Sequence, residues 1–341
     1  VMDLQKMEAV ARGIVAPGKG VLAADESFPT IKKRFDSINI ESTEENRRAY
    51  RELLFTTEGV EEFVGGVITF DETMRHKTAD GTPFPDLLTA RGIYPGVKVD
   101  KGTRDLALYP GEKFTQGLDG LRERLAEYVE MGATFTKWRT VYTIGKDVPT
   151  AYGYQINASS LAQYAALCQE VGLVPIVEPE VLMDGDHTLE CCEEVTTITL
   201  DAVFSEMFAA GVKLEGILLK PNMILAGKGC TEQASVQEVA EATIRVLMRT
   251  VPPAVPGIVF LSGGQTPAQA TENLSAMNAI GGFPWQLSFS YGRALQEETL
   301  KSWLGKEANV AAAQKSFYRR AKLNSMARYG DYSPDLETKP V

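Results

Sequence analysis

Residues 173–180 read LVPIVEPE, a short run of apolar and β-branched residues that ends on two carboxylates. Seven other runs share its apolar character, and longer stretches with apolar residues three and four positions apart lie between them. The eight runs cover residues 20–27, 64–71, 94–100, 133–139, 173–180, 214–221, 257–264 and 285–292. This alternation predicts a parallel sheet wrapped by helices, and eight units is the number that closes a (β/α)8 barrel.

The longer stretches predict amphipathic helices at residues 118–131, 159–171, 189–210, 236–249 and 267–277, with further helices at 1–15 and 306–328. The rival architecture is an open doubly wound sheet, which usually carries a Gly-x-Gly-x-x-Gly turn after an early strand. The sequence has no such turn. Because no Pro- or Ser-rich linker divides the chain, we expect one α/β domain over residues 1–341, a TIM barrel with extra N- and C-terminal helices and a tail from about residue 329 to 341.

Composition argues against several classes of function. The chain has 35 Lys and Arg against 45 Asp and Glu, a net charge of −10, so nucleic acid is not an expected partner. Two His and four Cys without a Cys-x-x-Cys pair argue against a zinc site of the usual spacing and against a disulfide framework. Residues 1–15 predict neither a signal peptide nor a membrane span. A reduced cytoplasmic compartment fits best, and a plastid form stays open.

Polar and charged residues stand at the C-terminal ends of the eight runs. In a (β/α)8 barrel these ends converge on one mouth, where the active site lies. Lys137 and Arg139 are two residues apart, as are Glu178 and Glu180, so each pair points to one face of its strand. In chain order the run ends carry Asp25, Asp71, Lys98, Lys137, Arg139, Glu178, Glu180, Lys220, Ser262, Gly263, Gly264, Ser290 and, just beyond, Arg293.

Lys220 has the most apolar surroundings of any lysine in the chain, within residues 216–222 (GILLKPN). An ordinary lysine, with a pKa near 10.4, is only about one part in 2,500 neutral at pH 7. Burial and a neighbouring cation, for which Lys137 is the candidate, favour the neutral amine. A neutral amine can attack a carbonyl to form a Schiff base, whose iminium withdraws electrons from the adjacent carbon. The structural alternative is that Lys220 pairs with Glu178 or Glu180 only to stabilise the fold.

Glu178 and Glu180 are paired carboxylates on either side of Pro179. Iminium chemistry needs a group that moves protons, and a carboxylate near the lysine suits that task. The same tripeptide can equally finish a strand and cap a helix. The pair is therefore a hypothesis for general acid–base catalysis.

Two basic or glycine-rich segments suggest phosphate binding. Ser262, Gly263 and Gly264 follow the seventh run, and Ser290 and Arg293 follow the eighth, where barrels of this type commonly bind phosphate. Residues 32–34 read KKR. That cluster is either a solvated helix face or a site for a second phosphate at the far end of a long substrate.

Seven motifs resemble those of class I fructose-1,6-bisphosphate aldolase, in the same order from about residue 3 to about residue 332. They are GVLAADES (20–27), KVDKG (98–102), KWR (137–139), VPIVEPE (174–180), LLKPNM (218–223), LSGGQ (261–265) and FSYGRAL (289–295). Two features depart from the family pattern. Many members have Gly after a Ser-x pair where this chain reads Ser27-Phe28-Pro29-Thr30, and many end in a terminal Tyr that the sequence given lacks.

The resemblance implies a role for each candidate residue. Lys220 would form the Schiff base, Glu178 would be the main proton-transfer residue, and Glu180, Lys137 and Asp25 would assist. In the family, the Asp at the position of Asp25 handles the carbon-4 hydroxyl during carbon–carbon cleavage. Arg34, Lys98 and Arg139 would lie toward the 6-phosphate half, and Ser262, Gly263, Gly264, Ser290 and Arg293 would hold the other phosphate.

The implied activity is reversible cleavage of fructose 1,6-bisphosphate to dihydroxyacetone phosphate and glyceraldehyde 3-phosphate, with sedoheptulose 1,7-bisphosphate as a second sugar bisphosphate substrate. The resemblance also implies no metal, no cofactor and a homo-oligomer, usually a tetramer. One alternative is another Schiff-base barrel, such as a transaldolase-like or single-phosphate aldolase. A second alternative is a catalytically silent scaffold barrel. The joint presence of Asp25, Lys137, Glu178 and Lys220 argues against a silent barrel.

Overall fold

Eight parallel strands form a closed barrel in the computed structural model, which describes residues 3–339. Their order around the barrel is β1-β10-β9-β8-β7-β6-β3-β2, and β1 pairs with both β2 and β10. The predicted TIM barrel is therefore confirmed, and the open sheet is wrong. The strands are β1 (Gly20–Ala24), β2 (Val64–Thr69), β3 (Tyr94–Lys98), β6 (Phe135–Tyr142), β7 (Val174–Val181), β8 (Leu218–Leu219), β9 (Gly257–Phe260) and β10 (Gln286–Tyr291), one in each predicted run.

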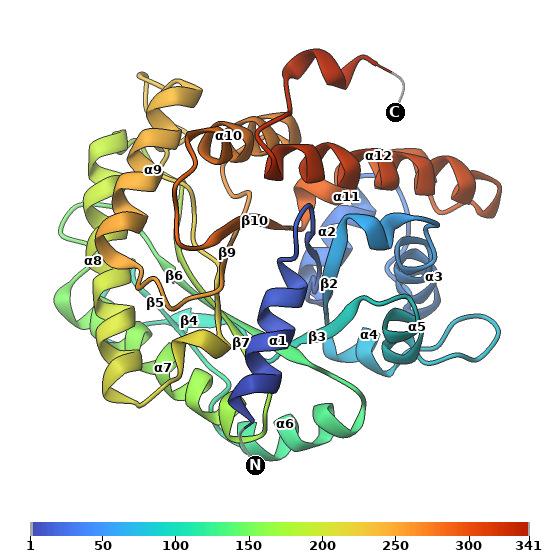
Figure 1. Cartoon of the computed structure of the whole chain (residues 1–341), viewed down its shortest axis with the longest axis horizontal. Coiled ribbons are helices and arrows are strands. Elements are labelled where there is room, and N and C mark those ends of the chain that lie inside the picture. Colours follow the sequence, from blue (N-terminus) through green and yellow to red (C-terminus); the bar gives the residue numbers. More distant parts are fainter. Residues whose placement is uncertain (1–2, 340–341) are drawn as a thin grey trace.

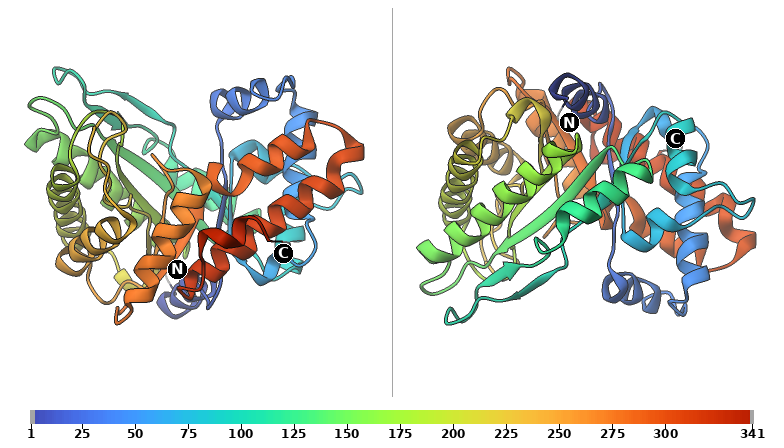
Figure 2. Two further views of the ribbon diagram at one scale, coloured as in Figure 1. Left: turned by 90° about the horizontal axis from the view of Figure 1, so that it is seen from above. Right: turned by 90° about the horizontal axis from the view of Figure 1, so that it is seen from below.

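Helices surround the strands (Figures 1 and 2). They are α1 (Leu4–Ile14), α2 (Phe28–Asp36), α3 (Glu44–Phe55), α4 (Asp71–Arg75), α5 (Phe84–Ala90), α6 (Leu121–Glu130), α7 (Ala151–Glu170), α8 (Leu189–Ala209), α9 (Val236–Thr250), α10 (Pro267–Ile280), α11 (Arg293–Trp303) and α12 (Val310–Arg328). Single turns of 3-10 helix lie at Val60–Glu62, Leu214–Gly216, Glu307–Asn309 and Pro334–Glu337.

The predicted helices are found, and the starts of α6, α7 and α12 are shifted by three to eight residues. Helix α7 begins at Ala151 rather than at residue 159, because the Thr150 hydroxyl caps it by accepting from the Gly153 N–H. Helix α12 begins at Val310, after the 3-10 turn that replaces the expected start at residue 306. Residues 1 and 2 of the expected first helix lie outside the described residues. No helix within residues 3–339 is both long and apolar enough to span a bilayer.

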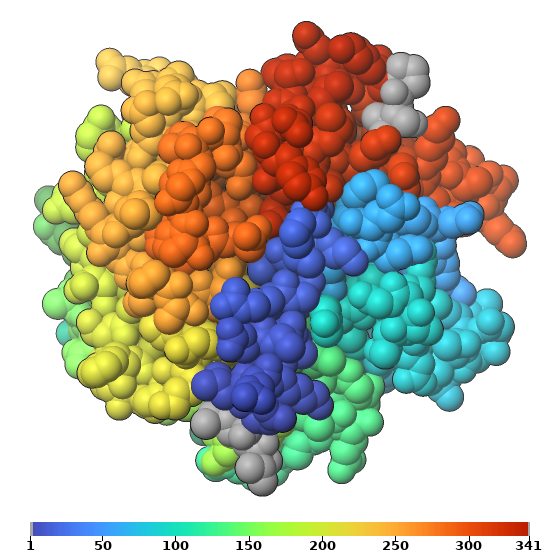
Figure 3. Space-filling view, viewed as in Figure 1, coloured from blue at the N-terminus to red at the C-terminus, as the bar shows by residue number. Residues whose placement is uncertain are grey.

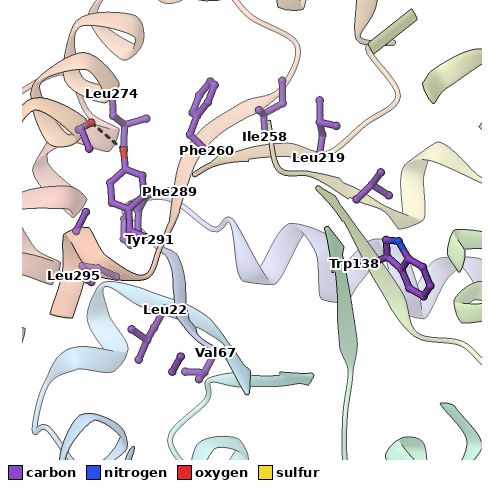
Figure 4. Packing of buried hydrophobic residues seen from close by; sticks show 14 of the residues in the cluster. Leu22, Val67, Trp138, Leu219, Ile258, Phe260, Leu274, Phe289, Tyr291 and Leu295 are labelled. Atoms are coloured by element: carbon purple, nitrogen blue, oxygen red, sulfur yellow. Dashed lines mark hydrogen bonds between the residues drawn. The ribbon is translucent and has the colours of Figure 1, made fainter. Parts of the chain in front are cut away.

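The main apolar core lies between the barrel and its helices. Figure 4 shows Leu22, Trp138, Leu219 and Tyr291 projecting from their strands into this layer. Each of these four side chains is at most 1% exposed, and the Tyr291 hydroxyl donates to the Ala270 carbonyl of α10 at 2.9 Å. Burying large side chains of this kind contributes roughly 1.5–3 kcal/mol each. This layer fixes the strands, and hence the positions of the residues at their ends.

A second, smaller core fills the inside of the barrel and is closed by α1. Met7 and Ile14 of α1 pack with strand residues such as Val21 and Ile176. The approach is close, since a Cβ at Gly65 would lie 2.2 Å from the Ile14 carbonyl oxygen. In the space-filling view, α1 crosses the middle of one face (Figure 3). The strand starts are therefore covered, and the opposite end of the barrel is left for the site.

A two-stranded antiparallel sheet, β4 (Thr103–Asp105) and β5 (Lys113–Thr115), is inserted between β3 and α6. This sheet is not predicted by the sequence pattern, because three-residue strands with charged side chains lack the apolar alternation of longer strands. The Thr115 hydroxyl donates to the Arg139 carbonyl at 2.8 Å and ties this insertion to β6.

The expected C-terminal tail packs back onto the barrel helices in its described part, residues 329–339. The Tyr332 hydroxyl donates to Glu337 at 2.6 Å, and Glu337 also accepts from Arg320 of α12 at 2.6 Å. The Tyr332 N–H donates to the Ser275 hydroxyl of α10 at 3.2 Å. Residues 340 and 341 of the predicted tail lie outside the described residues.

Candidate active site

A cleft of about 980 Å³ opens at the C-terminal ends of the strands. The twelve predicted site residues that line it are Asp25, Arg34, Lys98, Lys137, Arg139, Glu178, Glu180, Lys220, Ser262, Gly263, Ser290 and Arg293. Gly264 is absent from the lining. Its φ is +82°, and a Cβ there would lie 2.7 Å from Cγ of Met183, so it shapes the turn behind Gly263.

Four side chains from four barrel strands, two within β6 and β7 and two just after β1 and β8, form one continuous chain of ion pairs. Nζ of Lys137 lies 2.7 Å from Oδ2 of Asp25 and 3.1 Å from Oε2 of Glu178. Nζ of Lys220 lies 3.3 Å from Oε1 of the same Glu178. Lys137, Glu178 and Lys220 are each only 4% exposed. The two lysines and two carboxylates balance in charge, which permits them to be buried together.

The charges on Asp25 and Lys137 are held in place by each other. Burial opposes ionisation of Asp25, but Lys137 and Lys220 outweigh it and lower its pKa from 3.8 to about 2. Burial also opposes the charge on Lys137, and Asp25 and Glu178 outweigh it, raising its pKa above that of an ordinary lysine. Asp25 is therefore an anion and Lys137 a cation throughout the physiological pH range.

A second pair of cations lines the β3–β6 side of the cleft. Nε of Arg139 lies 2.5 Å from Oε2 of Glu180, and Nζ of Lys98 lies 2.6 Å from Oδ1 of Asp100. Asp100 also accepts from the Arg139 N–H at 3.2 Å. Burial opposes the charge on Arg139, and neighbouring carboxylates, Glu180 first among them, raise its pKa. Asp100 was not among the predicted site residues. Its position two residues after Lys98 could have indicated that it belongs to the site.

The loops after β9 and β10 present hydroxyls and a helix start to the cleft. Ser290 is 1% exposed, and its hydroxyl has no hydrogen-bond partner among the described residues. Gly292 precedes α11, whose first residue is Arg293. Arg293 donates to the Gln265 carbonyl and lies 3.5 Å from Glu297. A free hydroxyl, a guanidinium and the N–H groups of a helix start are suited to an anion such as phosphate.

Of the basic cluster at residues 32–34, only Arg34 lines the cleft. Lys32 instead pairs with Asp36 on the exposed face of α2 at 2.7 Å. Arg34 lies beside Gly292, where a Cβ would come within 3.4 Å of its Nη2.

Several lining residues near the Arg34 end were missed by the sequence analysis. The Ser27 and Thr30 hydroxyls lie 3.2 Å apart at the start of α2, and Pro29 stands in the first turn, where no helical hydrogen bond is lost.

Two further lining residues, Lys101 and Arg104, lie beside the inserted β4–β5 sheet. No strand-end pattern marks them, because that sheet was itself not predicted.

Potential metal ligands do not converge in the cleft, whose lining residues include no His or Cys. Within residues 3–339 one group of three such ligands was found, Glu44, Glu72 and His76, and none of these lines the cleft. Arg47 donates to both oxygens of Glu72 at 2.5 and 2.7 Å, so that carboxylate is already neutralised. The group is best described as a structural ion pair beside a buried His.

Comparisons with known proteins agree over nearly the whole chain. The family model "Fructose-bisphosphate aldolase class-I" matches residues 6–340. A "Probable fructose-bisphosphate aldolase class 1" of Xanthomonas campestris pv. campestris is 54% identical over 332 residues, covering 97% of this chain and 99% of the relative. The fructose-bisphosphate aldolase of Dictyostelium discoideum is 54% identical over 333 residues, covering 97% and 93%.

A solved structure is equally similar. Fructose-bisphosphate aldolase from Plasmodium falciparum, in a complex with TRAP and a small-molecule inhibitor, has a TM-score of 0.95 and 51% identity, covering 97% of this chain and 96% of that one. The barrel, the lysine at the end of β8 and these matches point to one conclusion: this chain belongs to the class I fructose-bisphosphate aldolase family.

Proposed function

We propose that Lys220 forms the Schiff base in the reversible cleavage of fructose 1,6-bisphosphate to dihydroxyacetone phosphate and glyceraldehyde 3-phosphate. Class I fructose-bisphosphate aldolase activity itself follows from membership of the family. The observation that carries the residue assignment is the buried ion-pair chain Asp25–Lys137–Glu178–Lys220 at the cleft floor. In this chain Glu178 contacts both lysines, Lys220 through Oε1 and Lys137 through Oε2, which supports a role for it in proton transfer beside Lys220.

In the first half of the reaction, Lys220 passes a proton to Glu178, and the neutral amine that results attacks the ketone carbon of the open-chain sugar. Glu178 moves the protons that allow the resulting carbinolamine to lose water and leave a protonated iminium. The contact of 3.3 Å between Lys220 and Glu178 supports this assignment. Lys137 keeps Glu178 oriented through its other oxygen, and Glu180 assists from the next outward position on β7.

In the second half, the bond between carbons 3 and 4 breaks and its electron pair flows into the iminium, giving an enamine. Asp25 accepts the proton of the carbon-4 hydroxyl as the aldehyde forms. With a pKa of about 2, Asp25 is a weak base, so it acts while the bond breaks rather than by removing the proton beforehand. Protonation of the enamine and hydrolysis then release dihydroxyacetone phosphate and free Lys220.

The two phosphates are assigned to opposite sides of the cleft. Ser262, Gly263, Ser290 and Arg293 hold the carbon-1 phosphate, Gly264 shapes the turn behind Gly263, and Lys98 and Arg139 attract the 6-phosphate half. Arg34 joins the 6-phosphate group by family resemblance, although its neighbour Gly292 belongs to the other side. Two separate cationic groups favour a bisphosphate over a single-phosphate or transaldolase-like substrate. Sedoheptulose 1,7-bisphosphate is the proposed second substrate, because it differs from fructose 1,6-bisphosphate only in the aldehyde half.

Exchange of Lys220 for methionine tests the proposal. Lys220→Met keeps the length and apolar stem of the side chain but removes the amine. The rate of fructose 1,6-bisphosphate cleavage, measured by the release of both triose phosphates, should therefore fall below about 1% of the parent rate. Unchanged unfolding temperature shows that the fold survives. Cleavage at more than a tenth of the parent rate by this variant contradicts the role of Lys220 and leaves a different residue as nucleophile.

The family resemblance further suggests a single-domain subunit in a homotetramer, working in the cytoplasm or a plastid without metal or organic cofactor. Light scattering coupled to size-exclusion chromatography measures the assembly. A mass of four subunits is expected, and a monomer under all concentrations contradicts the tetramer.

A further inference from the structure

Glu26, which follows Asp25 directly, belongs to a buried polar network that the reaction scheme above does not use. Glu26 is 7% exposed. Its carboxylate accepts from Nη2 of Arg51 at 2.6 Å, from Nε2 of Gln296 at 2.9 Å and from Nη1 of Arg34. A buried carboxylate with three donors, two of them guanidinium groups, is fully satisfied and held in one position.

The supports of Glu26 are themselves immobile. Arg51 of α3 is 1% exposed and donates from Nε to the Ala24 carbonyl at 2.9 Å. Gln296 of α11 is fully buried, donates to the Ala23 carbonyl at 2.9 Å and accepts from the Tyr50 hydroxyl at 3.1 Å. Helices α3 and α11 thereby fix Glu26 against the end of β1, next to the cleft.

Arg34 is the most exposed of the three charged side chains in this network. Its side chain is 21% exposed, against 1% for Arg51 and 4% for Glu26. Only Nη1 of Arg34 is held by Glu26, which leaves its other donors for a ligand. The absence of a side chain at Gly292 leaves room for the Arg34 guanidinium. A Cβ at Gly292 would lie 3.4 Å from Nη2 of Arg34 and 3.2 Å from the Ala23 carbonyl oxygen.

The charges of the network explain why an anion would be attracted there. Two guanidinium groups share one carboxylate, so the network carries a net charge of +1 before substrate enters. Without Glu26, Arg34 and Arg51 would repel each other, and the exposed Arg34 would swing toward solvent. Arg51 cannot swing, because it is buried and bound to the Ala24 carbonyl.

We propose that Glu26 is a positioning residue: anchored by Arg51 and Gln296, it holds the Arg34 guanidinium at the cleft wall in the orientation that receives a substrate phosphate. The inference rests on the proposed function, in which Arg34 binds phosphate. It assigns Glu26 a task in substrate affinity that is separate from the proton transfers of Asp25 and Glu178.

The test is a double-mutant cycle with fructose 1,6-bisphosphate as substrate. Glu26→Gln keeps the shape of the side chain and removes its charge, and it should raise KM about tenfold, as expected for weakening one charge-assisted contact, while kcat changes less than about threefold. Arg34→Ala should raise KM at least as much. The double variant should have the KM of Arg34→Ala alone, because Glu26 acts only through Arg34.

Glu72→Gln is the matched control. Glu72 also pairs with an arginine, Arg47, at 2.5 Å, but neither residue lines the cleft, so KM should not change. If Glu26→Gln lowers the unfolding temperature too far for assay, Glu26→Asp replaces it. This variant keeps the charge, shortens the side chain by one methylene and should also raise KM. Borohydride trapping of dihydroxyacetone phosphate on Lys220 shows that each assayed variant retains its chemistry.

The outcomes separate the inference from the function on which it rests. If Arg34→Ala leaves KM unchanged, Arg34 does not bind phosphate and that part of the proposed function fails. If Arg34→Ala raises KM but both Glu26 variants leave KM unchanged, the positioning role of Glu26 is wrong. The same holds if the double variant raises KM by the product of the two single increases.

Discussion

Lys220 contacts one oxygen of Glu178 at 3.3 Å, while the other oxygen of that carboxylate lies 3.1 Å from Lys137. The two lysines thus share one carboxylate. In the proposed reaction the Lys220 nitrogen becomes part of a neutral carbinolamine, and Glu178 would then keep its second partner, Lys137. Under that proposal, the shared contact lets one buried carboxylate serve a nucleophile whose charge changes during the reaction.

Exchange of Glu178 for glutamine should slow the reaction by about 10²–10⁴-fold in kcat, the range that general acid–base catalysis contributes. In Glu178→Gln the new amide keeps the volume and one acceptor of the side chain but cannot carry a proton between intermediates. Steady-state rates with fructose 1,6-bisphosphate, together with the rate of Schiff-base trapping, measure the effect. A kcat within threefold of the parent would show that another group transfers the protons.

The lowered pKa of Asp25 makes a prediction about stability and pH. Because its folded pKa of about 2 is below the unfolded value of 3.8, ionised Asp25 adds about 2 kcal/mol to the free energy of unfolding above pH 3.8. This contribution is lost as the pH falls from 3.8 toward 2. Urea unfolding of the parent and Asp25→Asn should therefore differ at pH 7 and converge near pH 2. An equal difference at both pH values would contradict the pairing with Lys137.

The phosphate assignment of Arg293 is tested against a neighbour on the same helix. Arg293 and Lys301 both contact Glu297 of α11, at 3.5 and 2.6 Å, but only Arg293 lines the cleft. Arg293→Ala should raise KM for fructose 1,6-bisphosphate at least tenfold, and Lys301→Ala should leave it unchanged. Equal KM values for the two variants would remove Arg293 from the phosphate site.

Chelation should leave the activity intact. The cleft lining offers two lysines in contact with a shared carboxylate and no His or Cys, and in the proposed mechanism a covalent iminium is the electron sink that a metal ion supplies in other enzymes. Assay after prolonged incubation with EDTA is the measurement. A loss of activity that a divalent ion restores would overturn the metal-free mechanism.

The sequence predicted the barrel because each of its eight strands overlaps an apolar run, including β8, which has only two residues, Leu218 and Leu219. Their position after the 3-10 turn Leu214–Gly216 still matched the period of the other units. Strand-end chemistry was equally predictable, since parallel strands bring their C-terminal ends to one mouth. Periodicity and topology together therefore identified twelve of the cleft residues.

The rest depended on contacts between distant segments. Lys101 and Arg104 lie beside a two-stranded insertion that has no apolar period. Glu26 was visible in the AADES motif, but its importance lies in Arg51 and Gln296, which come from α3 and α11. Within residues 32–34 the family resemblance alone singled out Arg34, and the structure places Lys32 on the exposed face of α2 and Arg34 in the cleft.

The central claim is that Lys220 is the nucleophile, and borohydride trapping measures it most directly. The protein is incubated with dihydroxyacetone phosphate, reduced with borohydride, digested and analysed by peptide mass spectrometry, with phosphate replacing the ketone as control. We predict one adduct, on the peptide that contains Lys220, and none in the control. An adduct on Lys137 or Lys98 with Lys220 unmodified, or no adduct in active protein, would contradict the account.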